Sequence, residues 1–82
     1  MTINKTWTEA VGDILTREKA SLRPRISYDA LSERTGISRR QLIRYLAGER
    51  SPSLAEVEAI CEVFGLDPFR DVLAPANDKI KG

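Results

Sequence analysis

The stretch from residue 38 to residue 48 carries the side chains of this chain that are best suited to chemistry. It reads Ser-Arg-Arg-Gln-Leu-Ile-Arg-Tyr-Leu-Ala-Gly and contains Arg39, Arg40 and Arg44. A guanidinium group presents a planar fork of N–H donors, which can pair with two acceptors on a phosphate or on the major-groove edge of guanine. Because Arg40 and Arg44 are four residues apart, a helix would project both side chains from one face. So many arginines on so short a helix predict a polyanionic ligand.

The rest of the sequence offers little to catalysis. The 82 residues contain no histidine and one cysteine, and they lack a glycine-rich phosphate cradle. The sequence therefore lacks the groups of side chains that usually carry out acid–base, nucleophilic or metal-dependent catalysis. We expect no catalytic residue, no bound metal and no cofactor, and we do not expect an enzyme. Cys61 falls within an apolar helical stripe and is expected to be a small buried core residue.

The charges of the chain are distributed unevenly, although the net charge of the whole is only +1. Residues 23–50 contain seven arginines and three acids, which gives this half a net charge of +4. Residues 51–78 contain one arginine and six acids, which gives a net charge of −5. A basic half and an acidic half would turn a defined face of the domain toward a polyanion. The alternative explanation is a solvated arginine face that has no ligand.

The length of the chain allows one domain with a small core, which we expect to be helical. No stretch approaches the length of a membrane span, and the first residues lack the apolar segment of a signal peptide. We therefore expect a cytoplasmic protein that does not contact membranes.

Signals for helix starts recur along the chain and divide it into five helices. A Ser or Thr followed three residues later by Glu or Gln is a capping box, in which two side chains satisfy free backbone N–H groups. This pattern occurs at Thr6, Ser38 and Ser53. Ser27 and Asp67 are the expected caps of the two other helices. The expected helices cover residues 7–20, 28–35, 39–46, 54–64 and 68–73.

Glycine and proline mark the segments between these helices. Gly36 stands in a tight turn between the second and third helices, and Gly48 follows the third. We expect a helical domain over residues 6–74, with a flexible arm at residues 1–5 that could contact DNA and a flexible tail at residues 75–82.

Two helices joined by a tight glycine turn, with arginines on the second, form a helix-turn-helix, whose second helix enters the major groove. The residues from Ile26 to Leu54 resemble the Xre/Cro family of phage and bacterial repressors. The most specific pieces are the turn Thr-Gly-Ile-Ser, the aromatic-containing third helix closed by glycine, and the following Arg-Ser-Pro-Ser-Leu. The likeness extends from the first helix to Leu73. It implies an all-α, compact five-helix, lambda-repressor-like domain that binds double-stranded operator DNA and regulates transcription.

The resemblance implies base-reading roles for Arg39, Arg40 and Arg44, and the fork of arginine donors predicts a guanine-containing half-site. Ile43 either meets a thymine methyl group or packs along the border of a neighbouring helix. A helical wheel cannot bury both Ile43 and Leu46, so at least one should lie at the surface or at an edge. Tyr45 is expected to be structural, with its hydroxyl group reaching an edge.

The resemblance also implies contacts with DNA phosphates, which fix the register on the duplex without reading its sequence. The candidates are Ser27, Tyr28, Ser38, Arg50 and Ser51. The family often has glutamine at the place of Tyr28, so the geometry of that contact differs here. For Arg50 the alternative is a salt bridge with Glu49 or Glu33.

The sequence leaves alternatives open for the partners and for the biological role. The apolar residues Phe69, Val72 and Leu73 either form the surface of a homodimer or close the core over the first helix. A homodimer could form in solution or only on DNA, and monomeric binding is the other option. The short single domain favours a phage Cro-like or immunity repressor, encoded by a phage or by the bacterial host. The rival is a helical protein-interaction module, or an antitoxin-type autoregulator, that acts mainly through a partner protein.

Overall fold

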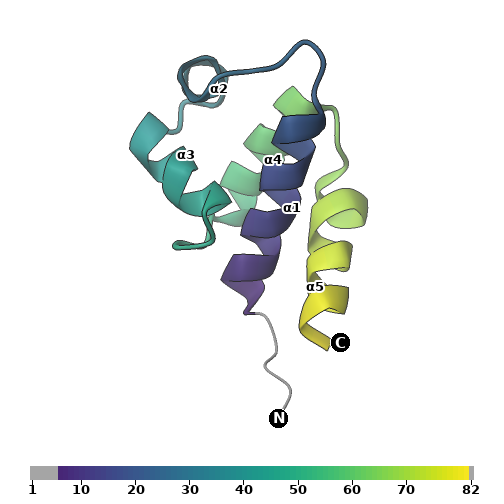
Figure 1. Cartoon of the computed structure of the whole chain (residues 1–82). Helices are drawn as coiled ribbons and strands as arrows, with labels where there is room; N and C mark the ends of the chain where they lie inside the picture. Colours follow the sequence, from purple (N-terminus) through teal and green to yellow (C-terminus); the bar gives the residue numbers. More distant parts are fainter. Residues whose placement is uncertain (1–5, 82) are drawn as a thin grey trace.

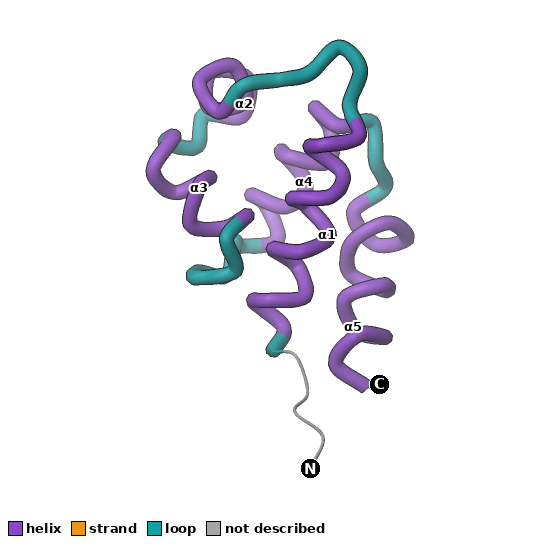
Figure 2. Tube along the Cα trace, viewed as in Figure 1, coloured by secondary structure: helices purple, strands orange, loops and turns teal. Residues whose placement is uncertain are grey.

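The computed structural model describes residues 6–81, and all the elements within them are helices (Figure 1, Figure 2). They are α1 Trp7–Ser21, α2 Tyr28–Thr35, α3 Arg39–Leu46, α4 Leu54–Phe64, the π-helical turn η1 Pro68–Leu73, and α5 Ala74–Lys81. The all-α fold predicted from the sequence is thus confirmed. The arm expected at residues 1–5 lies outside the described residues.

α1 occupies the middle of the fold, with α3 packed on one side of it and α5 on the other (Figure 1). α2 in turn packs on α3 and α4. Every one of these helices except α5 contributes a large side chain that is completely shielded from solvent: Leu15, Leu31, Leu42, Ile60 and Val72. Burying one such side chain stabilises a fold by about 1.5–3 kcal/mol. The single core therefore sets the position of α3 relative to the other helices.

Two of the expected capping boxes are complete. At the start of α1, Thr6 Oγ1 accepts a hydrogen bond from the Glu9 N–H at 3.2 Å, and the Glu9 carboxylate accepts one from the Thr6 N–H at 3.2 Å. At the start of α4, Ser53 Oγ accepts from the Glu56 N–H at 3.2 Å, and Glu56 Oε1 accepts from the Ser53 N–H at 2.8 Å. These reciprocal bonds satisfy backbone donors that a helix start leaves free.

The third expected capping box, at the start of α3, is only half formed. Ser38 Oγ accepts a hydrogen bond from the Gln41 N–H at 3.2 Å, as predicted. The Gln41 side chain does not return to the Ser38 N–H, because its Oε1 atom is turned into the protein, where it is buried without a hydrogen-bond partner in the described residues. The prediction of a complete box was wrong at this helix.

The flexible tail expected at residues 75–82 is also wrong over residues 75–81, which belong to α5. The chain passes from η1 into α5 without a break, and the Ala74 N–H donates to the Phe69 carbonyl. Pro75 has no N–H to donate back into η1, so it removes one backbone hydrogen bond of this continuous helical segment. Ala76 is fully buried and Ile80 packs against the core, so apolar contact with α1 stabilises this helix.

The helices are short, and the longest, α1, has 15 residues. Within residues 6–81, no helix combines the length and the apolar character that crossing a bilayer requires. The same residues contain no group of three or more His, Cys, Asp or Glu side chains that could hold a metal ion.

Cys61 is buried in the core, as expected, and should be unreactive in the folded protein. Burial, together with the nearby charges of Asp71, Asp67 and Glu18, raises the pKa of its thiol to about 11. Because the thiolate is the reactive form, labelling by an aromatic disulfide reagent at pH 8 should be slow in buffer and rapid in denaturant. Rapid labelling of the native protein would show that the core opens readily at α4.

Candidate nucleic-acid interface

The turn between α2 and α3 is set by one glycine and by two hydroxyl side chains. Gly36 has a left-handed backbone with φ of 77°, and its N–H donates to the Ser32 carbonyl at 2.9 Å. Ser32 Oγ donates to the Ile37 carbonyl at 2.6 Å, and Thr35 Oγ1 accepts from the Ile37 N–H at 3.2 Å. Ile37 is buried in the core. These contacts fix the angle at which α3 leaves the turn.

α3 has an apolar inner face and a cationic outer face. Leu42, Tyr45 and Leu46 are buried. The outer face carries the exposed side chains of Arg39, Arg40 and Ile43, with Arg44 half-buried beside them. Ile43 is 37% exposed and Leu46 is 4% exposed. Ile43 is therefore the surface residue that the helical wheel required, and Leu46 belongs to the core.

The inner face of α3 is tied to α1 at very short range. Thr16 Oγ1 on α1 donates a hydrogen bond to the Leu46 carbonyl at 2.6 Å. A Cβ atom placed on Gly12 would lie 2.7 Å from the Gly48 nitrogen and 2.8 Å from the Tyr45 carbonyl oxygen. α1 therefore contacts the end of α3 backbone to backbone, which leaves little freedom for α3 to shift.

Tyr45 is buried, and its hydroxyl group reaches an edge of the fold, as expected. Its Oη atom donates to Glu56 Oε2 on α4 at 2.7 Å. Burial raises the pKa of Tyr45, and the hydrogen bond to the Glu56 carboxylate raises it further. Tyr45 thus stays neutral and able to donate at physiological pH.

The arginines of α3 differ in their partners. Arg39 Nε lies 3.1 Å from Asp29 Oδ1 on α2, and the two side chains are 60% and 84% exposed. An ion pair so open to water contributes at most about 1 kcal/mol. No acid among residues 6–81 lies within ion-pair distance of Arg40 or Arg44, so both guanidinium groups have their donors available.

The candidate phosphate-binding residues lie on both sides of α3. Ser27 and Tyr28 stand at the start of α2, and Ser38 caps α3 itself. Arg50 and Ser51 lie in the loop that follows α3, on the side opposite to α2 (Figure 1), and both are exposed. The structure therefore has a hydroxyl group at the start of α3 and a cationic and a hydroxyl group in the loop after it.

Arg50 forms no ion pair with Glu49 or Glu33 within residues 6–81, so the salt bridge considered as its alternative role is absent. Ser27 Oγ accepts the capping hydrogen bond of α2 from the Ala30 N–H at 3.1 Å. Because that bond uses a lone pair, the hydroxyl proton of Ser27 remains available for an anion.

Lys19 and Arg25 border the start of α2 and were missed by the sequence reasoning. Lys19 Nζ lies 4.3 Å from the centre of the Tyr28 ring, a cation–π contact that joins α1 to α2. Both cations line a hollow of about 210 Å³ that also includes Tyr28 and Leu46. No local signal identified them, because they come from the end of α1 and the following loop and meet Tyr28 only in the fold.

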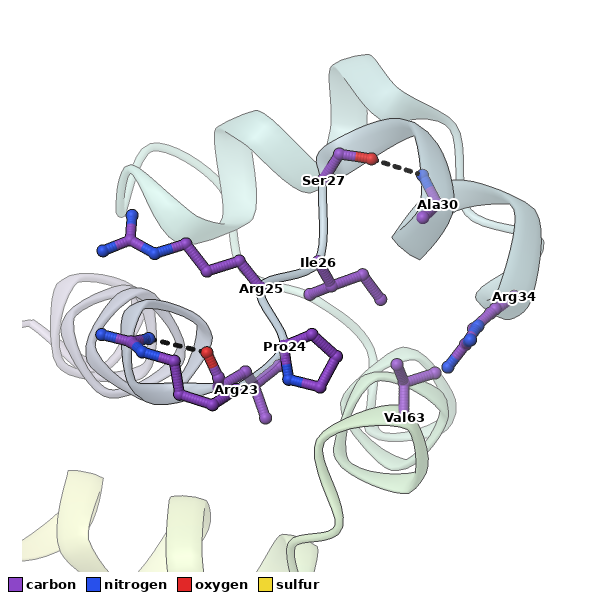
Figure 3. Close-up of a pocket in the computed structure, with 9 residues that line it drawn as sticks. Arg23, Pro24, Arg25, Ile26, Ser27, Ala30, Arg34 and Val63 are labelled. Atoms are coloured by element: carbon purple, nitrogen blue, oxygen red, sulfur yellow. Dashed lines mark hydrogen bonds between the residues drawn. The ribbon is translucent and has the colours of Figure 1, made fainter.

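A second hollow, of about 470 Å³, lies between the loop after α1 and α4 and contains three arginines, but they do not converge on it (Figure 3). Arg23 Nη1 donates to the Ala20 and Leu22 carbonyls at 2.8 and 2.7 Å, so its guanidinium group caps the end of α1. Arg25 points away from the hollow, whereas Arg34 extends from α2 toward Val63 (Figure 3). This geometry does not make a site for a small anion.

The residues expected to form a dimer surface are separated by the fold. Val72 is 0% exposed and belongs to the core, so a dimer contact through this side chain is ruled out. Phe69 is 59% exposed, and Leu73 lines an apolar hollow of about 260 Å³ together with Trp7 and Leu54. The segment thus both closes the core and leaves apolar surface.

A rigid glycine turn, a helix docked by its apolar face and arginines directed outward together define a DNA-binding helix-turn-helix protein. The model of a family described as helix-turn-helix matches residues 25–69, which is more than half of the chain. The protein therefore belongs to the Xre/Cro-like helix-turn-helix family of DNA-binding regulators. No curated protein and no solved structure matches the chain. The matched segment contains α2, α3 and α4.

Proposed function

We propose that the protein is a sequence-specific repressor of the phage Cro-like or immunity type, which inserts α3 into the major groove of an operator. The observation that carries this proposal is the outer face of α3, where Arg40 and Arg44 have no acidic partner among residues 6–81 while the inner face is buried. Each could donate two hydrogen bonds to the O6 and N7 acceptors of a guanine. Such contacts read sequence, whereas contacts with phosphates set the register.

The neighbours of these two arginines fit the same role. The exposed pair of Arg39 with Asp29 is weak enough to open, so that Arg39 can also contact a base. Ile43 presents an apolar side chain on the same outer face, which suits a thymine methyl group. Phosphate contacts would come from the start of α2 (Ser27 and Tyr28), from the start of α3 (Ser38) and from the loop after α3 (Arg50 and Ser51).

The mechanism that we propose is occupancy of the operator, in competition with polymerase or with another regulator. A homodimer with two-fold symmetry would place its half-sites about one helical turn, or 34 Å, apart. Phe69 and Leu73 remain candidates for its surface, because both retain exposed apolar area. The protein would act in the cytoplasm of a bacterial cell.

Selection of bound sequences from random duplex DNA tests this proposal directly. We expect a half-site that contains guanine, and a two-fold repeat of it if the protein binds as a dimer. Failure of the protein to bind any duplex at low salt would exclude the repressor function.

Replacing Arg50 with alanine should weaken binding to all duplexes by a similar factor. Arg50 lies in an exposed loop beyond the end of α3, where it would meet a phosphate rather than a base edge. Loss of one phosphate contact should reduce the slope of log K against log salt by about 0.9. Titrations at several salt concentrations, with one selected and one unrelated duplex, measure both effects. A loss confined to the selected duplex would instead assign Arg50 to a base.

A second candidate function is a protein-interaction module, and the apolar hollow lined by Trp7, Leu54 and Leu73 favours it. Trp7 and Leu54 are both exposed and lie beside each other around this hollow, and adjoining exposed apolar side chains are typical of protein-interaction sites. Salt separates the two functions, because DNA binding through phosphates weakens steeply as salt rises and an apolar contact does not.

A further inference from the structure

One carboxylate holds both ends of the loop that follows α3. Glu56 Oε2 accepts a hydrogen bond from Tyr45 Oη at 2.7 Å, and Tyr45 lies in the last turn of α3. Glu56 Oε1 accepts from the Ser53 N–H at 2.8 Å, and Ser53 is the cap of α4. The loop between these anchors carries Arg50 and Ser51.

The two oxygens of Glu56 have different tasks. The capping box of α4 requires only the acceptor that faces the Ser53 N–H. The second oxygen is used for Tyr45, which is buried on the inner face of α3. A hydroxyl group that donates to a carboxylate at this distance forms a strong, charge-assisted hydrogen bond. Glu56 therefore connects α3 to the first turn of α4, across the loop that carries Arg50 and Ser51. The first residues of this loop are also held, because the Gly48 and Glu49 N–H groups donate to the Tyr45 and Arg44 carbonyls.

The charge of Arg50 acts on both Glu56 and Tyr45, although the Arg50 side chain lies beyond ion-pair distance of the Glu56 carboxylate. Burial raises the pKa of Glu56, but the hydrogen bonds from Ser53 and Tyr45 and the charge of Arg50 outweigh it, and the pKa is lowered overall. The charge of Arg50 also lowers the pKa of Tyr45, against the larger effect of burial. The three side chains thus interact as a neutral donor, an anion and a cation.

α3 does not need this connection in order to dock. Leu42 and Leu46 are buried independently of it, and Thr16 Oγ1 holds the Leu46 carbonyl at 2.6 Å from the α1 side. Loss of the Tyr45 hydroxyl group should therefore leave α3 in place and release the loop.

We propose that Glu56 is a positioning residue. Through its hydrogen bond with Tyr45 it holds the loop that carries Arg50 at a fixed place relative to α3, so that Arg50 meets a phosphate while α3 contacts the bases. This inference rests on the proposed DNA-binding function. It assigns to Glu56 a role in binding although its side chain points away from the outer face of α3 and toward Tyr45.

A double-mutant cycle of Tyr45→Phe and Arg50→Ala on the full chain tests the inference, with a duplex obtained by selection as the probe. Tyr45→Phe keeps the buried ring and removes only the donor. We expect it to weaken binding by about two- to tenfold, the range for loss of one hydrogen bond. We also expect it to reduce the salt slope by about 0.9, as loss of the Arg50 contact does. In the Arg50→Ala background, Tyr45→Phe should have no further effect on affinity.

Asp71→Ala is the matched control. Asp71 Oδ2 accepts from the Asp67 N–H at 2.8 Å, so this substitution removes a side-chain hydrogen bond to a helix-start residue, as Tyr45→Phe removes one to Glu56, but in η1. Binding by this variant should match that of the wild type at temperatures below its melting transition. Thermal unfolding of every variant shows that the comparison is made on folded protein.

Three outcomes would overturn the inference while the DNA-binding function stands. The first is an equal effect of Tyr45→Phe in both backgrounds, which indicates a general loss of stability. The second is a salt slope unchanged by Tyr45→Phe, and the third is normal binding by Arg50→Ala. Absence of binding by the wild-type protein would instead reject the function on which the inference rests.

Discussion

Replacing Gly12 with alanine should be the most damaging small substitution in this protein. The added Cβ atom would lie 2.7 Å from the Gly48 nitrogen and 2.8 Å from both the Gly48 Cα atom and the Tyr45 carbonyl oxygen. All three are backbone atoms, which cannot rotate away as a flexible side chain can. Overpacking of a well-packed core costs about 1–3 kcal/mol, and we expect the upper end of this range or more. For a domain of this size, about 3 kcal/mol corresponds to a decrease in Tm of roughly 12–24 °C.

Thermal unfolding followed by circular dichroism measures this effect. Arg17→Ala is a suitable control, because Arg17 is an exposed residue of the same helix and its replacement should change the free energy of unfolding by less than about 0.5 kcal/mol. A Tm for Gly12→Ala within about 2 °C of the wild-type value would show that α1 and the end of α3 can move apart at little cost. In that case α3 would not be rigidly held by α1.

The helices that carry the interface could be predicted because their signals are local. Ser27 and Ser38 cap α2 and α3 through hydrogen bonds to residues three positions later. Gly36 adopts the left-handed conformation that the turn requires. Each of these features depends on neighbours within one helical turn, so the sequence contains all the information that is needed.

The predictions that were wrong concern segments whose structure is set by contact with a helix distant in the sequence. The polar and small residues from Pro75 onward predict a flexible tail, although Val72, Ala76 and Ile80 repeat at intervals of four residues along one face. That face is stabilised by packing with α1, which outweighs the weak local preference of this segment for a helix. Gln41 has the sequence position of a capping-box residue, yet its amide oxygen is turned into the protein.

The geometry of the interface could be predicted only in part. The burial of Tyr45 agrees with what the resemblance implies, whereas helical periodicity required only that Ile43 or Leu46 lie at the surface or at an edge, and the structure selects Ile43. The partners could not be predicted, because Asp29 meets Arg39, and Glu56 meets Tyr45, across different helices. Such pairings depend on the angles between helices, which no spacing within one helix reveals.

Arg40→Ala and Arg44→Ala should each relax the preference for a base at one position of the half-site. Neither arginine has an acidic partner within residues 6–81, so the substitution removes donors without releasing a buried charge. A bidentate contact with guanine contributes about 1–3 kcal/mol of discrimination, which corresponds to roughly 5- to 150-fold between matched and mismatched duplexes. Competition titrations with duplexes that differ at single positions measure this ratio for each variant.

Two matched variants separate the loss of base contacts from the loss of a positive charge. Arg40→Lys keeps the positive charge but loses the planar fork, so it should retain affinity for unrelated duplexes and lose discrimination. Arg70→Ala also removes one positive charge, but from η1, where Arg70 is paired with Asp71 at 3.0 Å. η1 does not belong to the helix-turn-helix, so Arg70→Ala should leave the base preference unchanged.

The comparison with Arg50→Ala decides whether α3 is the reading helix. If Arg40→Ala, Arg44→Ala and Arg50→Ala all weaken every duplex by the same factor, the arginines of α3 contact phosphates and the sequence is read elsewhere. If the first two change the preferred base and the third does not, specificity belongs to the outer face of α3. We expect the second result, because a side chain on a helix seated in the major groove can reach the O6 and N7 atoms of guanine, whereas a residue in the loop beyond that helix meets the backbone.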